Sequence, residues 1–111
     1  MLRRIVLATP LLGGAALLAA GRPGAQAAEG QVMIDNFSFS PAQLTVAAGT
    51  RVTWTNRDDI PHTVTDAATP RALRSPPLDT GESFAFTFDQ PGTYSYFCSL
   101  HPHMQGRAIV R

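Results

Sequence analysis

Near the C-terminus lies the stretch GTYSYFCSLHPHM, residues 92–104. Its first half alternates large side chains with small or polar ones, and this period of two is typical of a β-strand with one buried face. In that register Tyr94, Tyr96 and Cys98 share one face, while Ser95 and Phe97 share the other. If the tyrosines face the core, the thiol of Cys98 is also inside, at the point where the chain leaves the sheet.

The same alternation recurs upstream, and no stretch after the first residues has the apolar stripe of a helix. We expect short strands within residues 32–39, 44–46, 52–54, 62–64, 84–88, 94–98 and 107–110. Turn residues separate them, such as Gly49 and the pair Pro91-Gly92. Residues 66–82 contain three prolines and little pattern, so we expect a long loop there, with room for one short strand. About seven or eight short strands predict an all-β sandwich or barrel.

Residues 1–27 have the order of a secretory signal peptide. A basic start with Arg3 and Arg4 precedes an apolar run, and Ala25-Gln26-Ala27 offers small residues for a signal peptidase. The run is interrupted by Pro10 and is shorter than the ~20 apolar residues of a membrane-spanning helix. We therefore expect a cleaved signal, a mature domain of residues 28–111 with no stable membrane insertion, and a periplasmic location. The arginine pair leaves Sec and twin-arginine export both open.

Length and composition limit the function classes. The 111 residues suit a single domain, and the net charge of +1, with no lysine and no basic stripe, argues against nucleic-acid binding. A single cysteine excludes an internal disulfide. A domain this small commonly needs a disulfide or a metal to stabilise its modest core, so a bound metal is the natural candidate.

The second half of the stretch 92–104 places a thiol, an imidazole and a thioether at positions i, i+3 and i+6. These groups belong to Cys98, His101 and Met104. His62, on a distant predicted strand, adds a second imidazole. Two histidines and one cysteine with a weak methionine ligand are the donor set of a blue copper site. Cu(I) prefers soft sulfur and Cu(II) prefers nitrogen, so this mixture accepts both ions with little rearrangement.

Two other interpretations of the same residues are weaker. A structural zinc site favours further cysteine or histidine ligands in paired knuckles, and this chain has no second cysteine. A Cys98–His101 hydrolase dyad would need an orienting partner and an oxyanion-hole motif, and neither is evident. A copper site with all positions filled by protein leaves no place for a substrate, so we do not expect an enzyme.

Three motifs give the chain its resemblance to a known family. They are VTWTNRDDIPH over residues 52–62, GTYSYFC over residues 92–98 and the Cys98-x-x-His101-x-x-Met104 spacing. In these motifs residues 31–111 resemble a cupredoxin, and the short spacing to the methionine is similar to the amicyanin branch rather than to plastocyanin. The resemblance implies a Greek-key β-sandwich that binds one copper, with His62, Cys98 and His101 as equatorial ligands and Met104 as the axial one.

The resemblance also implies a function. We expect a monomeric electron carrier that docks transiently on redox partners, such as an amine dehydrogenase and a c-type cytochrome, through the exposed edge of His101. Pro61, Leu100, Pro102 and Met33 are candidates for the apolar patch around it. The alternative function is a copper carrier or buffer that delivers the ion to another exported protein.

Three positions depart from the family pattern. Thr63 stands where an asparagine commonly joins the two copper-binding loops, and we expect threonine to join them less well, although its backbone N–H could still donate to Cys98. His103 replaces an apolar aromatic, and its simplest interpretation is a solvent-exposed residue without a copper role. Leu100 replaces a proline, which predicts a less rigid loop.

Overall fold

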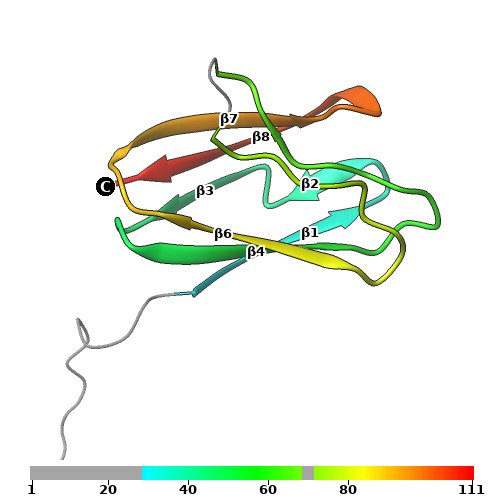
Figure 1. Cartoon of the computed structure of the whole chain (residues 1–111), viewed down its shortest axis with the longest axis horizontal. Helices are drawn as coiled ribbons and strands as arrows, with labels where there is room; N and C mark the ends of the chain where they lie inside the picture. The colour runs from blue at the N-terminus through cyan, green and yellow to red at the C-terminus, as the bar shows by residue number, and fades with distance from the viewer. Residues whose placement is uncertain (1–28, 69–71) are drawn as a thin grey trace, which may run out of the picture.

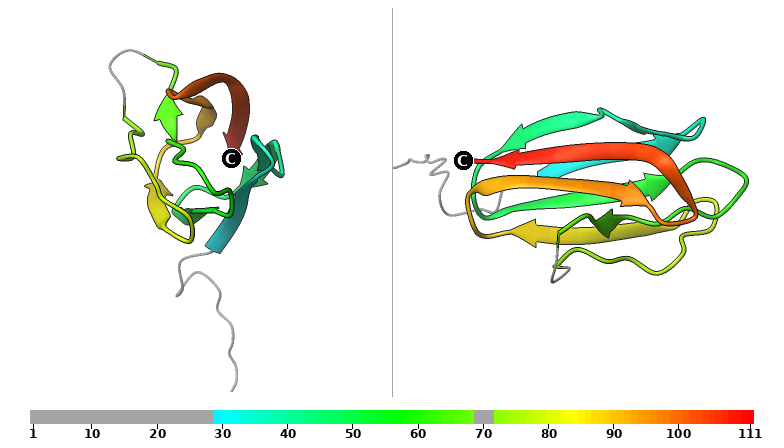
Figure 2. Two further views of the ribbon diagram at one scale, coloured as in Figure 1. Left: turned by 90° about the vertical axis from the view of Figure 1, so that its right-hand side faces the viewer. Right: turned by 90° about the horizontal axis from the view of Figure 1, so that it is seen from above.

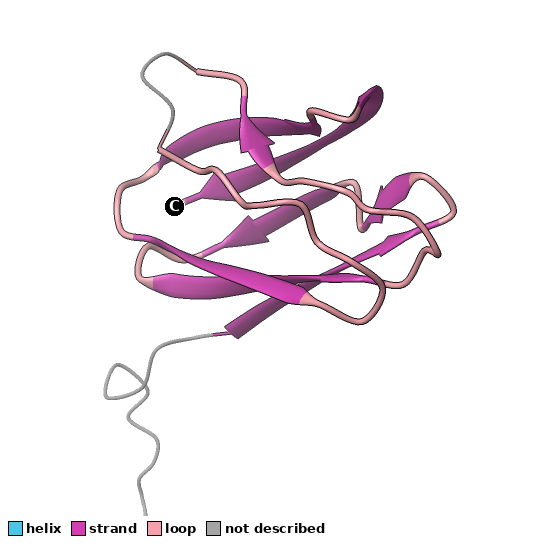
Figure 3. Ribbon diagram, turned by 45° about the vertical axis from the view of Figure 1, so that its right-hand side comes forward, coloured by secondary structure: helices cyan, strands magenta, loops and turns pink. Residues whose placement is uncertain are grey.

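The computed structural model describes residues 29–68 and 72–111, so the expected signal peptide, residues 1–27, lies outside the described residues (Figure 1). The described part contains strands and loops only, as Figure 3 shows. The predicted all-β class is confirmed. The eight strands are β1 Glu29–Asp35, β2 Ser38–Ser40, β3 Gln43–Val46, β4 Thr50–Asn56, β5 Thr65–Asp66, β6 Ser83–Phe88, β7 Gly92–Cys98 and β8 His101–Val110.

The strands form two four-stranded sheets that face each other (Figures 1 and 2). The first has the order β2-β1-β4-β6 and the second the order β3-β8-β7-β5. Two pairs are parallel, β1 with β4 and β3 with β8, and the other neighbours are antiparallel. The chain therefore crosses between the sheets repeatedly, which places residues distant in sequence at the same end of the sandwich.

Trp54 of β4 lies at the centre of the core and is fully buried. Its ring meets Tyr96 of the opposite sheet edge-on at 5.4 Å and Phe88 of its own sheet at 6.2 Å. The predicted parity of β7 is confirmed, because Tyr96 and Cys98 are buried while Ser95 is exposed. The alternating pattern thus packs the two sheets and delivers the thiol to the interior.

Two local predictions were wrong: the start of the last strand and the strand around His62. The last strand begins at His101 instead of 107, so the ligand-rich segment 101–104 belongs to β8 and only Ser99 and Leu100 separate it from β7. The segment around His62 is no strand; His62 forms a single bridge with Leu78 through two backbone hydrogen bonds of 3.1 and 2.7 Å. β4 has already ended at Asn56, and Pro61, which precedes His62, has no N–H to donate to a ladder.

Three connections meet at the end of the sandwich far from the C-terminus (Figure 1). They are the β1–β2 turn, the segment that follows β4, and the turn between β7 and β8. Each is anchored by strands in a fixed register, so the side chains at this end are held by the core. Within the described residues, no helix is long and apolar enough to cross a membrane.

Candidate metal centre

His62, Cys98 and His101 come together at this end of the sandwich, as the sequence predicted. One ligand atom from each residue lies within 4.8 Å of the others. The Sγ atom of Cys98 is 3.6 Å from Nδ1 of His62 and 3.7 Å from Nδ1 of His101. His62 and Cys98 are fully buried and His101 is half-buried. The three donors form a compact triangle that solvent reaches on the His101 side.

The β7–β8 turn holds Cys98 and His101 in a fixed relation. The ladder pairs Cys98 with His101 directly, after an irregularity in register between Phe97 and Cys98. Ser99 and Leu100 form the turn between them. Because paired residues of an antiparallel ladder point to the same face, the thiol and the imidazole are directed to the same point.

Asn56, at the end of β4, organises the segment that carries His62. Its side-chain amide donates to the carbonyl oxygens of Ile60 and Leu78, both at 2.8 Å. Its Oδ1 atom accepts the N–H of Asp58 at 2.9 Å. Asn56 is fully buried, so these bonds replace water and fix the course of the segment. Asn56 belongs to the motif over residues 52–62, but the sequence did not predict its hydrogen bonds to the segment that carries His62.

Asp58 binds the outer nitrogen of His62. Its Oδ2 atom lies 2.7 Å from Nε2 of the imidazole, and the Asp58 side chain is 12% exposed. Partial burial raises the pKa of Asp58, but the N–H groups of Phe37 and Asn36 and the imidazole of His62 together lower it below the ordinary value of 3.8. An ionised carboxylate only accepts hydrogen bonds, so Nε2 carries the hydrogen. In the neutral imidazole the lone pair is then on Nδ1, the nitrogen that lies 3.6 Å from the Cys98 sulfur.

Thr63 joins the two ligand-bearing segments. Its N–H donates to the Sγ atom of Cys98 at 3.4 Å, as expected. Its Oγ1 atom accepts the N–H of Ser99 at 2.8 Å and is also 2.8 Å from the Ser99 hydroxyl and 3.1 Å from the Thr65 hydroxyl. Although we expected threonine to join the segments less well than asparagine, its hydroxyl reaches the N–H and the hydroxyl of Ser99.

Replacing Thr63 with valine tests this link. Valine keeps the shape but removes the hydroxyl, so we expect the metal-free protein to lose about 1–3 kcal/mol of unfolding free energy. Chemical denaturation measures the loss. Thr63→Ser is the matched control, because it keeps the hydroxyl and should lose clearly less. Equal stabilities of the valine and serine variants would contradict the proposed role of the hydroxyl.

Phe37, which sequence reasoning did not single out for the site, lies beside both histidines. Its ring is edge-on to His62 at 5.6 Å and to His101 at 5.3 Å, and it is 45% exposed. Leu100, next to His101, is 49% exposed. These are the exposed large apolar side chains of the described residues; Phe37 contacts His101, and Leu100 precedes it in the chain.

Comparison with known proteins is consistent with this site. Residues 8–110 match the family described as the cupredoxin-like domain. The chain belongs to the cupredoxin family. Amicyanin-alpha of Methylorubrum extorquens is 34% identical over 89 residues, which cover 78% of this cupredoxin and 75% of that protein.

Solved structures show the same fold. A purple cupredoxin from Nitrosopumilus maritimus has a TM-score of 0.69 and 35% identity, over 74% of this chain and 99% of that one. An amicyanin variant described with Cu(I) has a TM-score of 0.70 and 31% identity, over 75% of this chain and 82% of that one. Copper is the cofactor that the family assigns to this cupredoxin.

The donor set and its spacing fit such an ion. A first-row metal lies about 2.0 Å from an imidazole nitrogen and about 2.3 Å from a thiolate, so in a trigonal arrangement sulfur and nitrogen are about 3.7 Å apart. The two observed separations are 3.6 and 3.7 Å. One thiol and two imidazole nitrogens are also the equatorial donors of blue copper sites. The cluster therefore has the chemistry and the dimensions of a copper site.

The remaining residues of the predicted site are located as follows. Met104 follows His101 on β8 and is buried, with 2% of its surface exposed. His103 is exposed, as its simplest interpretation required. Pro61 precedes His62 and Pro102 follows His101, and both prolines are exposed. Met33 of β1 is half-buried.

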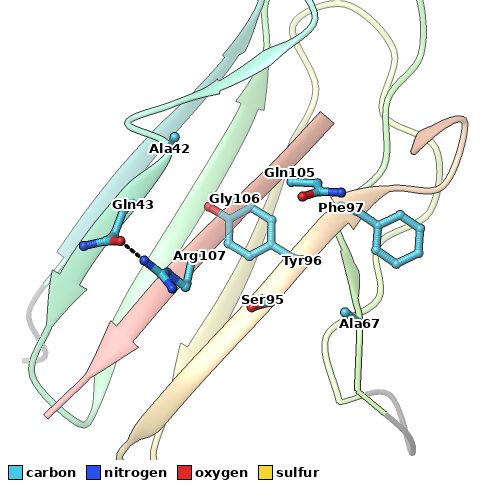
Figure 4. A pocket seen from close by; sticks show the side chains of 9 residues that line it. All are labelled: Ala42, Gln43, Ala67, Ser95, Tyr96, Phe97, Gln105, Gly106 and Arg107. Atoms are coloured by element: carbon cyan, nitrogen blue, oxygen red, sulfur yellow. Dashed lines mark hydrogen bonds between the residues drawn. The ribbon is translucent and has the colours of Figure 1, made fainter. Parts of the chain in front are cut away.

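A shallow hollow of about 480 Å³ lies elsewhere on this cupredoxin (Figure 4). Residues of β7, β8 and the start of β3 line it, among them Ser95, Arg107 and Gln43. None of the four candidate copper ligands belongs to its lining. The hollow is therefore separate from the metal centre.

Proposed function

We propose that this cupredoxin is an exported electron carrier with one copper ion. In this proposal residues 1–27 are a signal peptide that is removed, and residues 28–111 form the mature periplasmic domain. The protein passes single electrons between other redox proteins and turns over no substrate. The observation that carries the proposal is the cluster of His62, Cys98 and His101, in which both sulfur–nitrogen separations, 3.6 and 3.7 Å, suit one trigonally bound ion.

In the proposed site His62, Cys98 and His101 are the equatorial ligands and Met104 is the weak axial ligand. Bound copper would supply a one-electron couple between Cu(I) and Cu(II). The protein holds its donors rigidly: Asp58 orients His62, the ladder joins Cys98 to His101, and Thr63 donates to the sulfur. Donors fixed by the fold in this way move little when the charge of the ion changes, and this favours fast electron transfer.

We further propose that partners dock over His101. This imidazole is the partly exposed ligand, and the apolar side chains of Phe37 and Leu100 are exposed beside it. A small apolar surface suits a short-lived complex. We propose transient redox proteins as partners, with an amine dehydrogenase and a c-type cytochrome as the first pair to examine, since amicyanins are relatives.

The test is a visible absorption spectrum of residues 28–111 with one equivalent of Cu(II), followed through reduction and reoxidation. We expect an intense blue band that bleaches with a reductant and returns with an oxidant over repeated cycles, because the thiolate of Cys98 is bonded to the ion in both states.

Either alternative outcome is informative. A pale solution would overturn the assignment of Cys98 as a copper ligand. A band that forms but is lost on cycling, with copper released to the buffer, would favour the copper carrier over the electron carrier.

A further inference from the structure

The turn between β1 and β2 has an unusual sequence for its shape. The register pairs Asp35 with Ser38, so Asn36 and Phe37 form a two-residue hairpin loop. Both have positive φ angles, 51° and 57°. Loops of this kind favour Asn-Gly, because glycine adopts positive φ without a steric cost. Phenylalanine therefore occupies a strained position that glycine would fill more easily.

Burial does not compensate for this strain, because 45% of the Phe37 side chain is exposed. Its ring instead contacts the two histidines of the metal centre edge-on, with interplanar angles of 86° and 88°. His62 and His101 in turn lie 5.0 Å apart, centroid to centroid. The three rings form one cluster in the geometry that aromatic pairs prefer. A strained residue that contacts a functional site is a candidate for a role in that site.

A single carboxylate fixes this arrangement. Oδ1 of Asp58 accepts the N–H of Asn36 at 2.7 Å, and Oδ2 accepts the N–H of Phe37 at 2.9 Å. The same Oδ2 atom accepts from Nε2 of His62 at 2.7 Å. The strained turn and the histidine are thus bonded to one side chain, which holds the backbone of Phe37 close to His62.

The two histidines differ in how firmly the rest of the protein holds them. His62 is fully buried, is paired with Leu78 through its backbone and is bonded to Asp58. His101 is half-buried, and its backbone pairs with Cys98 across the Ser99-Leu100 turn, but among the described residues no carboxylate is bonded to its imidazole. Among the described residues, Phe37 and His62 are its aromatic neighbours. The ring of Phe37 therefore stands against the less restrained of the two imidazoles.

We propose that Asp58 and Phe37 are positioning residues that retain copper: Asp58 fixes the β1–β2 turn, and the ring of Phe37 keeps His101 directed at Cys98. This inference rests on the proposed function. It explains the strained turn, since the conformation that is costly for phenylalanine is the one that brings its ring to both histidines. Removing the ring should then ease the turn and weaken metal retention at the same time.

The experiment measures two quantities for each variant of residues 28–111. One is the rate at which the reduced, copper-loaded protein transfers Cu(I) to an excess of bathocuproine disulfonate. The other is the Tm of the metal-free protein. Phe37→Gly should transfer copper about three- to tenfold faster, since one aromatic contact to His101 is lost. Its metal-free Tm should equal or exceed that of the original protein, because glycine relieves the strained φ.

Further variants separate positioning from general damage. Phe37→Tyr keeps the ring and should retain the original transfer rate, whereas Phe37→Leu keeps apolar bulk only and should be faster. Asp58→Asn should also be faster, and the Phe37→Gly/Asp58→Asn double variant should show less than the product of the two single effects. Asp59→Asn removes the same charge from an exposed neighbouring position and should behave as the original protein.

The proposal is overturned if Phe37→Gly forms the blue band and transfers copper at the original rate, or if the effects of Phe37→Gly and Asp58→Asn multiply fully. A clearly lower metal-free Tm for Phe37→Gly would also overturn it, because Phe37 would then be a residue of general stability. Failure of the proposed function is distinguishable, since the unsubstituted protein itself would then develop no blue band or would lose the band on redox cycling.

Discussion

Cys98→Ser should give a protein that folds but forms no blue band with Cu(II). The band requires a thiolate bonded to copper, and the serine hydroxyl stays protonated and binds copper poorly. We expect the affinity for Cu(I) to fall by about 100-fold or more, since the loss of residues that only orient ligands already costs 10–100-fold. Absorption spectra and competition with a Cu(I) chelator measure the two effects.

Met104→Leu is the control for this substitution. Leucine removes the thioether and leaves the thiolate, so an intense band should persist, because a methionine in the proposed axial position is a weak ligand. Circular dichroism of the metal-free proteins shows whether both variants fold. If Cys98→Ser is folded and still turns blue, the thiolate assignment is wrong.

The strand content and the Cys98–His101 pair were both predictable from local patterns. In any β-strand, alternation places Tyr96 and Cys98 on the same face, independently of contacts with the rest of the chain. Both residues are buried in the structure. The spacing from Cys98 to His101 suits two neighbouring strand ends, and the ladder pairs those two residues. These features depend on neighbours in sequence, so a single sequence reveals them.

The residues around the ligands were harder to predict, because their contacts join distant segments. Asp58 bonds to the turn at Asn36 and Phe37 across 21 or 22 residues. The Asn-Phe pair also lacks the glycine that marks a two-residue hairpin turn, so the strong sequence signal was missing. The start of β8 at His101 was hidden for a related reason: the polar histidines and Pro102 break the alternation, and the register shifts here, since Phe97 pairs with Gln105 and Cys98 with His101 while residues 102–104 have no partner in the β7–β8 ladder.

Gly106→Ala should destabilise the whole domain. Gly106 pairs with Tyr96 in the β7–β8 ladder, and the tyrosine ring lies against it (Figure 4). A Cβ atom on Gly106 would be 2.5 Å from Cε1, 2.7 Å from Cζ and 2.8 Å from Oη of that ring. The ring has little freedom to move, because Phe39 and Trp54 pack edge-on against it at 4.9 and 5.4 Å.

We expect this added methyl group to cost about 1–3 kcal/mol of unfolding free energy, the usual range for overpacking a core. In a domain of this size that lowers Tm by roughly 5–20 °C, which calorimetry of the metal-free protein measures. Gly30→Ala is the control, since its nearest contact would be 3.2 Å, to Val52, and its effect should be smaller. In a Tyr96→Leu background the ring is absent, so Gly106→Ala should cost much less. The same cost in both backgrounds would show that the destabilisation does not come from the tyrosine ring.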